Sequence, residues 1–334
     1  MAAGATGVVR IGVLGAARIA PPAIVRPARA VDEAEVVAIA ARDPSRARAF
    51  ATKHKIAKVH ESYTALLEDP DIDAVYNPLP NGLHGRWTIA ALEAGKHVLC
   101  EKPFTANADE AIEVAAVAQR TGLVVMEAFH YRYHPLTIGL VSLLRSGELG
   151  SLRHIETWMC TPLLPPKDIR WQLGLAGGST MDVGCYTIHL LRSLAGAEPE
   201  VVRAAARERG SGVDRWLQAD MRLPDGVTGR ITASMLSRRL LSLGARVECS
   251  HGSIRVLNPY APHFFHRVVV RGPKGRRRER YGRTPTYVYQ LRAFTGAVLR
   301  GEPILTGPDD SIATMRVIDD CYRAAGMEVR QPTA

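Results

Sequence analysis

Short apolar runs alternate with amphipathic stretches through the first third of the chain. The apolar runs indicate strands at residues 8–15 (VVRIGVLG), 36–41 (VVAIAA), 73–77 (DAVYN) and 97–100 (HVLC). Helix boundaries fall between them: Asp43 precedes Pro44, Asn107 has Glu110 three residues on, and glycines stand at positions 95 and 122, where helices should end. Strands that alternate with helices predict βαβ units and a parallel sheet.

The pattern changes after about residue 127. Longer strand candidates follow at residues 152–160, 215–223, 227–234 and 264–272, with turn signals such as Pro224-Asp225-Gly226 between several of them. We therefore predict two α/β domains. Residues 1–127 should form a doubly wound parallel sheet, and residues 128–334 a domain with a large mixed or antiparallel open-faced sheet. Whether the C-terminal helix packs back on the first domain is left open.

Composition limits the classes of protein to consider. The chain has 334 residues, 46% of them hydrophobic, and no apolar run long enough to span a bilayer. Its first residues lack the charged start and apolar segment of a signal peptide, so we expect a cytoplasmic location and no membrane partner. Five scattered cysteines without C-x-x-C spacing argue against both a disulfide framework and a structural zinc site.

The chain carries a net charge of +10. Part of this charge comes from residues 272–283 (GPKGRRRERYGR), which contain six basic residues and one glutamate. The segment is either an anion-binding arm or a solvated hairpin between strands, and the hairpin is the more common case. No helix-turn-helix, zinc finger or aromatic-rich strand motif accompanies it. We therefore expect no nucleic-acid partner.

The turn after the first predicted strand resembles a dinucleotide-binding fingerprint. Residues 15–20 read G-x-A-x-x-A, with only the first glycine intact. Such turns let the pyrophosphate approach the backbone at a helix N-terminus. The motif alone is weak, but its place directly after the first strand of a βα pattern strengthens it. The candidate cofactor contacts are Gly15, Ala17, Arg18 and Ile19.

The end of the second predicted strand bears on the choice between NADP and NAD. An acid there would hydrogen-bond the ribose hydroxyls of NAD, whereas arginine accommodates the additional phosphate of NADP. Asp43 stands immediately before Pro44 and is better placed to cap the next helix. Arg42 and Arg46 then remain as a two-pronged phosphate site. NADP is favoured, and NAD stays possible.

The strand at residues 97–100 runs directly into Glu101, Lys102 and Pro103. A strand that ends at the carboxyl edge of a parallel sheet delivers its last side chains into the crevice where ligands bind. Pro103 cannot continue a ladder and keeps Lys102 extended, so we expect a fixed ammonium group. A charged surface turn is the alternative.

A second candidate segment begins at Gly177-Gly178 and continues as a predicted helix. Asp182, Tyr186, His189 and Ser193 fall at i, i+4, i+7 and i+11, which makes a single polar stripe. Such a stripe usually faces water. Tyrosine and histidine beside aspartate are less typical of a solvent face than lysine and glutamate, so the stripe is also a candidate site.

Several segments together resemble the Gfo/Idh/MocA family of sugar and cyclitol oxidoreductases, and within it the branch of glucose-fructose oxidoreductase, aldose 1-dehydrogenases and dimeric dihydrodiol dehydrogenase. They are RIGVLGAARIA, VVAIAARDPSRARAFA, DAVYNPLPNGLHGRWTIAALEAGKHVLCEKPF, MEAFHYRYHP and GGSTMDVGCYTIHLLR. The resemblance implies a Rossmann domain, then an α/β domain whose open sheet forms a homodimer or homotetramer. It also implies an active site between the two domains.

The resemblance assigns roles to particular residues. Lys102 corresponds to the active-site lysine, Glu101 lies beside the nicotinamide, and a cis Lys-Pro bond is possible. Tyr186 holds the position of the general base. The implied cofactor and substrate contacts are Pro78, Leu79, Asn81, His84, Arg170 and Trp171. His130 departs from the family pattern, where an apolar residue is common. We expect it to pack or to touch substrate rather than to pair with His134 on a metal, and we expect no metal.

Oxidation of an alcohol requires removal of the hydroxyl proton as hydride leaves. A free phenol titrates near pH ~10 and is a weak base at neutrality, but a cation within ~4–6 Å favours its phenolate form. We therefore assign Tyr186 as acid/base and Lys102 as its electrostatic partner and hydroxyl donor. Asp182 would position the substrate or orient Lys102.

Three hypotheses remain. The first is an NAD(P)-dependent dehydrogenase or reductase that acts on a sugar, polyol or related cyclic diol. The second is a nucleotide-sugar ketoreductase with the same fold. The third is a non-catalytic NADP-binding protein, against which the presence of both Lys102 and Tyr186 argues.

Overall fold

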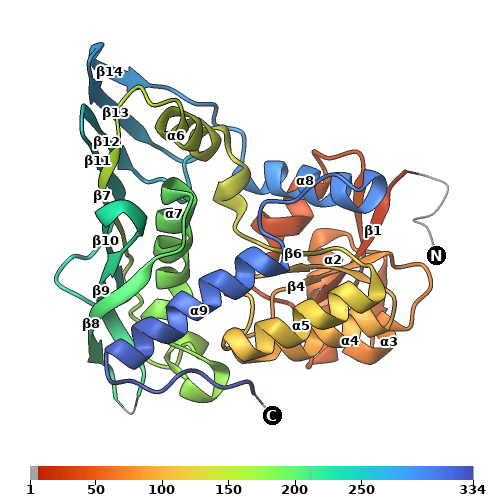
Figure 1. Cartoon of the computed structure of the whole chain (residues 1–334). Helices are drawn as coiled ribbons and strands as arrows, with labels where there is room; N and C mark the ends of the chain where they lie inside the picture. The colour runs from red at the N-terminus through yellow and green to blue at the C-terminus, as the bar shows by residue number, and fades with distance from the viewer. Residues whose placement is uncertain (1–6, 211, 334) are drawn as a thin grey trace. The chain divides into compact units, whose positions relative to one another are not determined.

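The computed structural model describes residues 7–210 and 212–333 of the chain. It divides into two compact units. The first runs to His130 and includes Pro285–Ile312, and the second comprises Tyr131–Thr284 and the residues from Ala313 onward (Figure 1). The chain thus enters the second unit close to the predicted boundary at residue 127. Residues 285–312, which we predicted in the second domain, belong to the first unit.

The first unit contains a parallel sheet of six strands among the described residues. Every neighbouring pair is parallel, as the alternating pattern predicted. Strand order reverses between β1 and β4, and ligands bind beyond the carboxyl ends of the strands at such a switch point. From edge to edge the strands are β3 (Lys58–His60), β2 (Ala34–Ala40), β1 (Val9–Leu14), β4 (Ala74–Asn77), β5 (His97–Cys100) and β6 (Val125–Glu127).

Helices α2 and α5 begin at the predicted capping residues, and α5 ends at the predicted glycine. Asp43 caps α2 by accepting from Ser45 N at 2.9 Å, Asn107 caps α5 by accepting from Glu110 N at 3.0 Å, and Gly122 ends α5 in the left-handed region. The elements are η1 (Pro21–Val25), α1 (Arg26–Ala28), α2 (Pro44–His54), α3 (Tyr63–Leu67), η2 (Asn81–Leu83), α4 (His84–Glu93), α5 (Ala108–Thr121) and α8 (Thr286–Arg300). Helix α8 joins the first unit because it packs on β1, η1 and α1.

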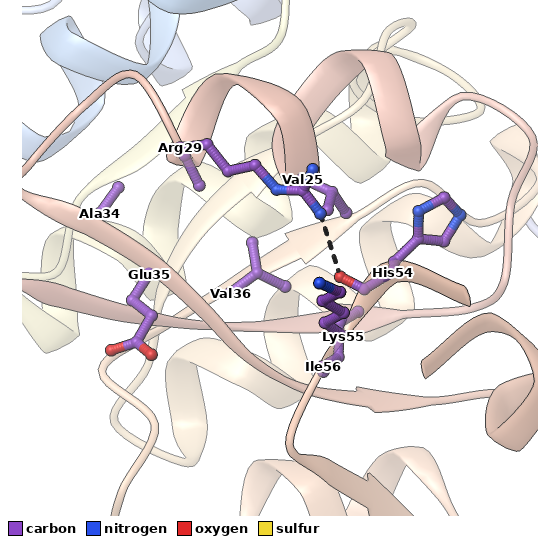
Figure 2. Close-up of a pocket in the computed structure, with 9 residues that line it drawn as sticks. Val25, Arg29, Ala34, Glu35, Val36, His54, Lys55 and Ile56 are labelled. Carbon is purple, nitrogen blue, oxygen red and sulfur yellow. Dashed lines mark hydrogen bonds between the residues drawn. The ribbon is translucent and has the colours of Figure 1, made fainter. Parts of the chain in front are cut away.

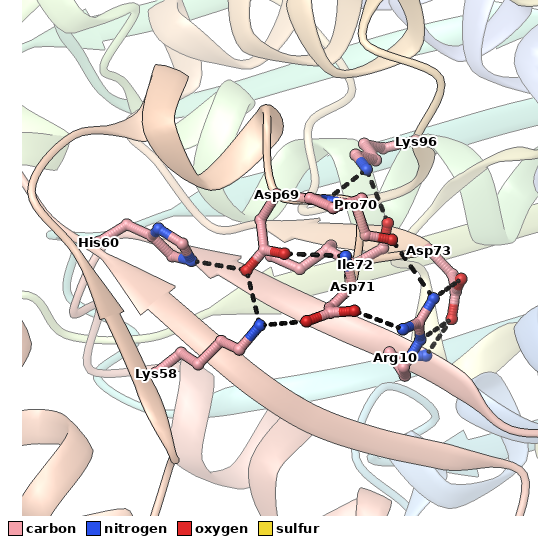
Figure 3. Close-up of polar contacts among 9 residues, drawn as sticks. All are labelled: Arg10, Lys58, His60, Asp69, Pro70, Asp71, Ile72, Asp73 and Lys96. Atoms are coloured by element: carbon pink, nitrogen blue, oxygen red, sulfur yellow. Dashed lines mark hydrogen bonds and ion pairs between the residues drawn. The ribbon is translucent and has the colours of Figure 1, made fainter.

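Ion pairs and hydrogen bonds close the amino-terminal edge of this sheet (Figure 3). Arg10 Nη2 lies 2.8 Å from Asp73 Oδ1, and Lys58 Nζ lies 3.1 Å from Asp69 Oδ2. The buried Lys96 donates to the carbonyl oxygen of Asp69 at 2.8 Å. Because these charged groups pair with one another, they hold the loop before β4 in place. The candidate ligand-binding groups lie at the opposite edge.

The second unit is built on a mixed sheet of eight strands among the described residues, which confirms the predicted fold class. Only β7 and β10 are parallel neighbours in it. The order is β14 (Gly275–Glu279), β13 (Arg267–Gly272), β12 (Gly252–Leu257), β11 (Ser242–Cys249), β7 (Leu152–Cys160), β10 (Thr228–Ser234), β9 (Asp214–Arg222) and β8 (Glu200–Glu208).

Helix α7 packs against β7 and β10 on one face of this sheet (Figure 1). All its residues from Cys185 to Arg192 are buried. The remaining elements from residue 130 on are η3 (His130–Tyr133), α6 (Pro135–Arg145), η4 (Ile169–Trp171), η5 (Leu173–Leu175), η6 (Thr180–Gly184), α7 (Cys185–Ala195), η7 (Pro224–Gly226) and α9 (Pro308–Ala324).

The basic segment 272–283 forms most of the β13–β14 hairpin, as its sequence favoured. Two of its cations are paired: Lys274 Nζ lies 3.0 Å from Glu148 Oε2, and Arg277 Nε lies 2.7 Å from Glu279 Oε1. Across residues 7–210 and 212–333, no helix is both long and apolar enough to cross a membrane.

Candidate functional site

The turn after β1 has a backbone conformation that requires glycine at its first position. Gly15 adopts φ +96°, and its N–H donates to Ala40 O at 2.7 Å. A Cβ at Gly15 would lie 3.1 Å from Leu79 Cδ2, so glycine is needed here both for backbone conformation and for space. Ala17, Arg18 and Ile19 lie in the connection between β1 and η1, where Ala17 and Ile19 are partly buried and Arg18 is exposed.

The end of β2 presents two arginines beside this turn. Asp43 is engaged as the cap of α2, as predicted, while Arg42 and Arg46 are exposed. Arg46 Nη2 donates to Ala16 O at 3.4 Å. Burial raises the pKa of Tyr63 and the charges of Arg42 and Arg46 oppose that rise, which indicates that both guanidinium groups lie near the same hydroxyl. Paired guanidinium groups fit the additional phosphate of NADP.

At the carboxyl end of β5, Glu101 is 7% exposed and accepts from the Tyr76 hydroxyl at 2.7 Å. Lys102 is partly exposed, and the Lys102–Pro103 peptide bond is cis. Tyr287 on α8 lies near the same carboxylate: burial raises the pKa of its phenol, and the charge of Glu101 adds to the rise. Lys102 and Glu101 therefore occupy the sheet edge that the sequence predicted.

His84 connects two loops at this edge. It is 1% exposed, with Nδ1 2.7 Å from Pro103 O and Nε2 2.7 Å from Leu79 O. Both ring nitrogens face backbone carbonyl oxygens, so the ring serves to hold the two loops together. In the loop that His84 holds, Pro78 and Leu79 are buried and Asn81 is partly exposed. The loop is therefore fixed by backbone contacts to the histidine ring.

In the second unit, the segment after Gly177-Gly178 starts as a π-helical turn, Thr180–Gly184, and continues as α7. Tyr186 is 7% exposed and His189 is fully buried, so these two residues of the polar stripe do not face water. Helix α7 packs on β7 and β10 of the sheet. Asp182, in the π turn, is partly exposed. Wide turns of this kind are frequent at functional sites.

Aromatic residues surround Tyr186. The rings of Tyr131 and Tyr260 each have their centroids 5.8 Å from that of Tyr186. The Tyr131 hydroxyl lies 2.6 Å from His189 Nδ1, and both groups are buried. Sequence reasoning missed Tyr131 and Tyr260, because they come from segments distant in the chain. The segment MEAFHYRYHP, which carries part of the family resemblance and contains Tyr131, was the available signal for the first of them.

Asp182 pairs with arginine within its own unit. Arg170 Nε donates to Asp182 Oδ1 at 3.1 Å, and Arg170 Nη1 lies 3.2 Å from Asp168 Oδ1. The charge of Asp182 is the main cause that raises the pKa of Arg170. Trp171, the next residue, stacks under the Arg209 guanidinium at 4.7 Å from its ring centroid. Asp168 was not predicted from the sequence.

The two histidines considered as a metal pair have other contacts. His134 caps α6 by accepting from Leu136 N at 3.1 Å, and its Nε2 lies 3.1 Å from Gly282 O. His130 is 5% exposed, and its ring centroid lies 4.1 Å from that of Tyr287. Among the residues that the structure describes, no group of three or more metal-ligating side chains comes together.

A cavity of about 370 Å³ opens on the first unit, between the start of β2 and the C-terminal ends of α1 and α2 (Figure 2). It lies at the amino edge of the sheet, about 20 Å along β2 from the Gly15 turn at ~3.3 Å per residue. Arg29 donates to His54 O at 3.3 Å, and Lys55 ends α2. Basic side chains are favoured at helix C-termini because they interact with the helix dipole. The basic residues that line this cavity therefore need no bound ligand to account for them.

Comparison with known proteins assigns these features to one family. Residues 9–129 match the oxidoreductase family with an NAD-binding Rossmann fold, and residues 140–255 match the GFO/IDH/MocA C-terminal domain. The D-xylose 1-dehydrogenase (NADP(+)) 2 of Haloferax volcanii is 37% identical over 94% of this chain and 96% of its own length. The chain belongs to the Gfo/Idh/MocA family.

Other Gfo/Idh/MocA relatives act on related groups. A 3-ketoreductase from Actinomadura kijaniata, solved with NADP and TDP-benzene, has a TM-score of 0.88 and 31% identity and covers 95% of this chain and 98% of its own. The trans-1,2-dihydrobenzene-1,2-diol dehydrogenase of Sus scrofa is 37% identical over 68% of this chain and 67% of its own length. This protein is accordingly an NAD(P)-dependent oxidoreductase of the kind that acts on hydroxyl and carbonyl groups, as the sequence predicted.

Proposed function

We propose that the protein interconverts a hydroxyl and a carbonyl group of a sugar, polyol or related cyclic diol, with Tyr186 as acid/base. The observation that carries the proposal is the position of Tyr186. It lies in the first turn of a buried helix, and the rings of Tyr131 and Tyr260 hold its ring in one orientation. A phenol fixed in this way can meet a substrate hydroxyl in a defined direction.

In this proposal NADP supplies the hydride acceptor, and the protein's side chains manage the proton. Tyr186 accepts the hydroxyl proton during oxidation and returns it during reduction. The ammonium of Lys102 stabilises negative charge on the reacting oxygen and on the phenolate. Asp182, held by Arg170, accepts a hydrogen bond from a neighbouring substrate hydroxyl, and Trp171 and His130 complete the contacts to substrate.

The cofactor contacts in the proposal follow the geometry of the first unit. The Gly15 turn, with Ala17, Arg18 and Ile19, takes the pyrophosphate at the N-terminus of the following helix. The loop of Pro78, Leu79 and Asn81 covers the cofactor, Glu101 borders the nicotinamide, and His84 fixes both segments. Arg42 and Arg46 bind the additional phosphate of NADP.

The test is absorbance of NADPH during turnover with D-xylose, other aldoses, inositols and dihydrodiols. Tyr186→Phe and Lys102→Met should each lower kcat by on the order of 10²- to 10⁴-fold, the usual contribution of acid–base catalysis. Tyr281→Phe, which removes a phenol hydroxyl beside Gly139, should leave kcat unchanged. Full activity of Tyr186→Phe would contradict the proposal.

A nucleotide-sugar ketoreductase is the second candidate. It is favoured by similarity to the dTDP-3,4-didehydro-2,6-dideoxy-alpha-D-glucose 3-reductase of Actinomadura kijaniata, which is 34% identical over 93% of this chain. A rise in melting temperature with dTDP, together with no turnover of free sugars, would favour this candidate. Turnover of a free aldose without any effect of dTDP would favour the first.

We also propose assembly as a homodimer or homotetramer through the sheet of the second unit. Burial alternates along β12 and β13, so one face of the sheet is exposed, and Leu257 on it is 42% exposed. Light scattering after gel filtration should give the mass of two or four chains, and the mass of one chain would contradict the proposal.

We further propose a cytoplasmic location, in keeping with five free cysteines.

A further inference from the structure

Arg330, close to the C-terminus, is almost fully buried although it follows the last helix. Its side chain is 1% exposed, and its guanidinium group makes an ion pair with Asp214, Nη2 to Oδ1 at 2.9 Å. Its Nε donates to Gly177 O at 2.8 Å. Burial of a guanidinium group is unfavourable unless its donors are satisfied. The contacts of Arg330 therefore indicate a specific structural role for this side chain.

Asp214, at the start of β9, joins Arg330 to the turn that precedes α7. Its Oδ2 accepts from Ser179 Oγ, from Thr180 Oγ1 and from Thr180 N, each at 2.7 Å. Its Oδ1 accepts from the Tyr322 hydroxyl at 3.0 Å. One buried carboxylate thus fixes both the side chains and the backbone at the beginning of the π-helical turn.

The glycines of this turn leave the room that these contacts need. Gly178 adopts φ +137°, and a Cβ there would collide with Asp214 Oδ1. On the other side of the turn, Gly178 N donates to Arg170 O at 2.9 Å, and Asp182 N donates to Gly178 O at 3.0 Å. The turn is therefore held from both sides, by Arg330 with Asp214 and by the backbone of the residue that pairs with Asp182.

We propose that Arg330 is a positioning residue for Asp182 and Tyr186, so that the C-terminal tail completes the catalytic arrangement of the second unit. The inference rests on the proposed function. Arg330 fixes the carbonyl of Gly177 and so holds the Gly177-Gly178 turn, at which the π-helical segment Thr180–Gly184 begins. Because α7 continues directly from this segment, the segment sets the direction in which the Tyr186 side chain leaves α7. A shift of about 1 Å at such a point lowers rates by up to about 10²-fold.

The test compares Arg330→Lys, Arg330→Met and Arg330→Ala in the full chain. Lysine keeps the charge near Asp214 but cannot also reach Gly177 O in the same geometry. We expect kcat to fall by roughly 10- to 100-fold in Arg330→Met and less in Arg330→Lys, with KM for NADPH unchanged within about threefold. Guanidinium ion at millimolar concentration should restore part of the rate of Arg330→Ala, because it can occupy the vacated volume.

Arg192→Met is the matched control. Arg192 is a buried arginine on α7, the helix that carries Tyr186, and it is 6% exposed. Its Nε lies 2.6 Å from Glu198 Oε2, and its Nη1 lies 2.6 Å from Thr314 Oγ1. It lies at the opposite end of α7 from the Gly177-Gly178 turn. Its loss should lower the melting temperature to a similar extent while kcat, measured well below that temperature, stays close to the wild-type value.

The possible results separate this inference from the proposed function. Loss of activity in Tyr186→Phe with an unchanged kcat in Arg330→Lys and Arg330→Met would overturn the positioning role alone. An equal fall of kcat in Arg330→Met and Arg192→Met, without rescue by guanidinium, would show a merely structural arginine and would also overturn it. Unchanged kcat in Tyr186→Phe would overturn the proposed function instead.

Discussion

His84 lies between the carbonyl oxygens of Pro103 and Leu79, with one ring nitrogen 2.7 Å from each. Complete burial holds the pKa of His84 at about 4, so the ring is neutral at physiological pH and donates one proton to one of the two carbonyls. The ring thereby joins the loop of Pro78 and Leu79 to the peptide that follows Lys102. The sequence placed His84 in that loop, and the structure shows how its position stabilises both segments.

Replacement of His84 by alanine should weaken NADPH binding and lower stability together. A buried ring and a buried hydrogen bond are lost, which corresponds to about 2–4 kcal/mol in the free energy of unfolding. Urea unfolding and a fluorescence titration with NADPH measure the two effects. His97→Ala is the control, since His97 accepts from Val124 N at 2.9 Å at the opposite end of β5. Equal NADPH affinities of the two variants would contradict this role.

Loss of Arg42 and Arg46 should change the preference between NADP and NAD. Each charged hydrogen bond to the additional phosphate contributes about 1.5–3 kcal/mol, so each single alanine variant should lose at least tenfold in kcat/KM with NADP. The value with NAD should stay near that of the wild type. Arg48→Ala, which removes an exposed arginine of the same helix paired with Glu61, should change neither value. A parallel loss with both cofactors would refute the phosphate site.

The ion pair between Arg170 and Asp182 should contribute to substrate binding rather than to cofactor binding. Asp182→Asn should raise KM for the substrate about tenfold or more and leave the affinity for NADPH unchanged. A double-mutant cycle with Arg170→Gln should give a coupling free energy of about 0.5–3 kcal/mol. Strictly additive effects on KM would show that the two side chains act independently.

Stability should fall below neutral pH, in part because of His134. In the fold this imidazole accepts from Leu136 N, and burial lowers its pKa to about 4, whereas an unfolded histidine titrates near ~6.5. A lowered histidine pKa stabilises the fold fully above about pH 6.5, and the contribution is lost as pH falls toward 4. Between pH 7.5 and 5 the loss amounts to about 2 kcal/mol.

The variant His134→Asn isolates this effect, because asparagine also caps helices but does not titrate. Urea unfolding at several pH values should give a shallower dependence in this variant than in the wild type. Identical slopes would show that His134 is not the group responsible.

Local patterns accounted for the elements and for most of the candidate positions. Asp43 and Asn107 cap the helices that follow them, Gly15 begins the dinucleotide turn, and Lys102 follows β5 at the carboxyl edge. These features depend on neighbours within a few residues or on the period of a strand or helix, and such interactions can be inferred from the order of the residues.

Tertiary packing decided two points that periodicity could not. Tyr186 and His189 of the polar stripe are buried on α7, which packs against β7 and β10. Residues 285–312 belong to the first unit, because α8 packs on β1 and η1. Hydrophobic periodicity gives the character of a face but not the element that covers it.

The order of residues by itself determined the parallel sheet, the mixed sheet, the family and the chemical groups available for hydride and proton transfer. Only the tertiary structure decided which of those groups pair: Asp182 with Arg170, Tyr186 with the rings of Tyr131 and Tyr260, and Asp214 with Arg330. The partners of Tyr186 and Asp214 come from segments distant in the chain. Their choice depends on how whole elements pack and bury charge, which no local pattern encodes.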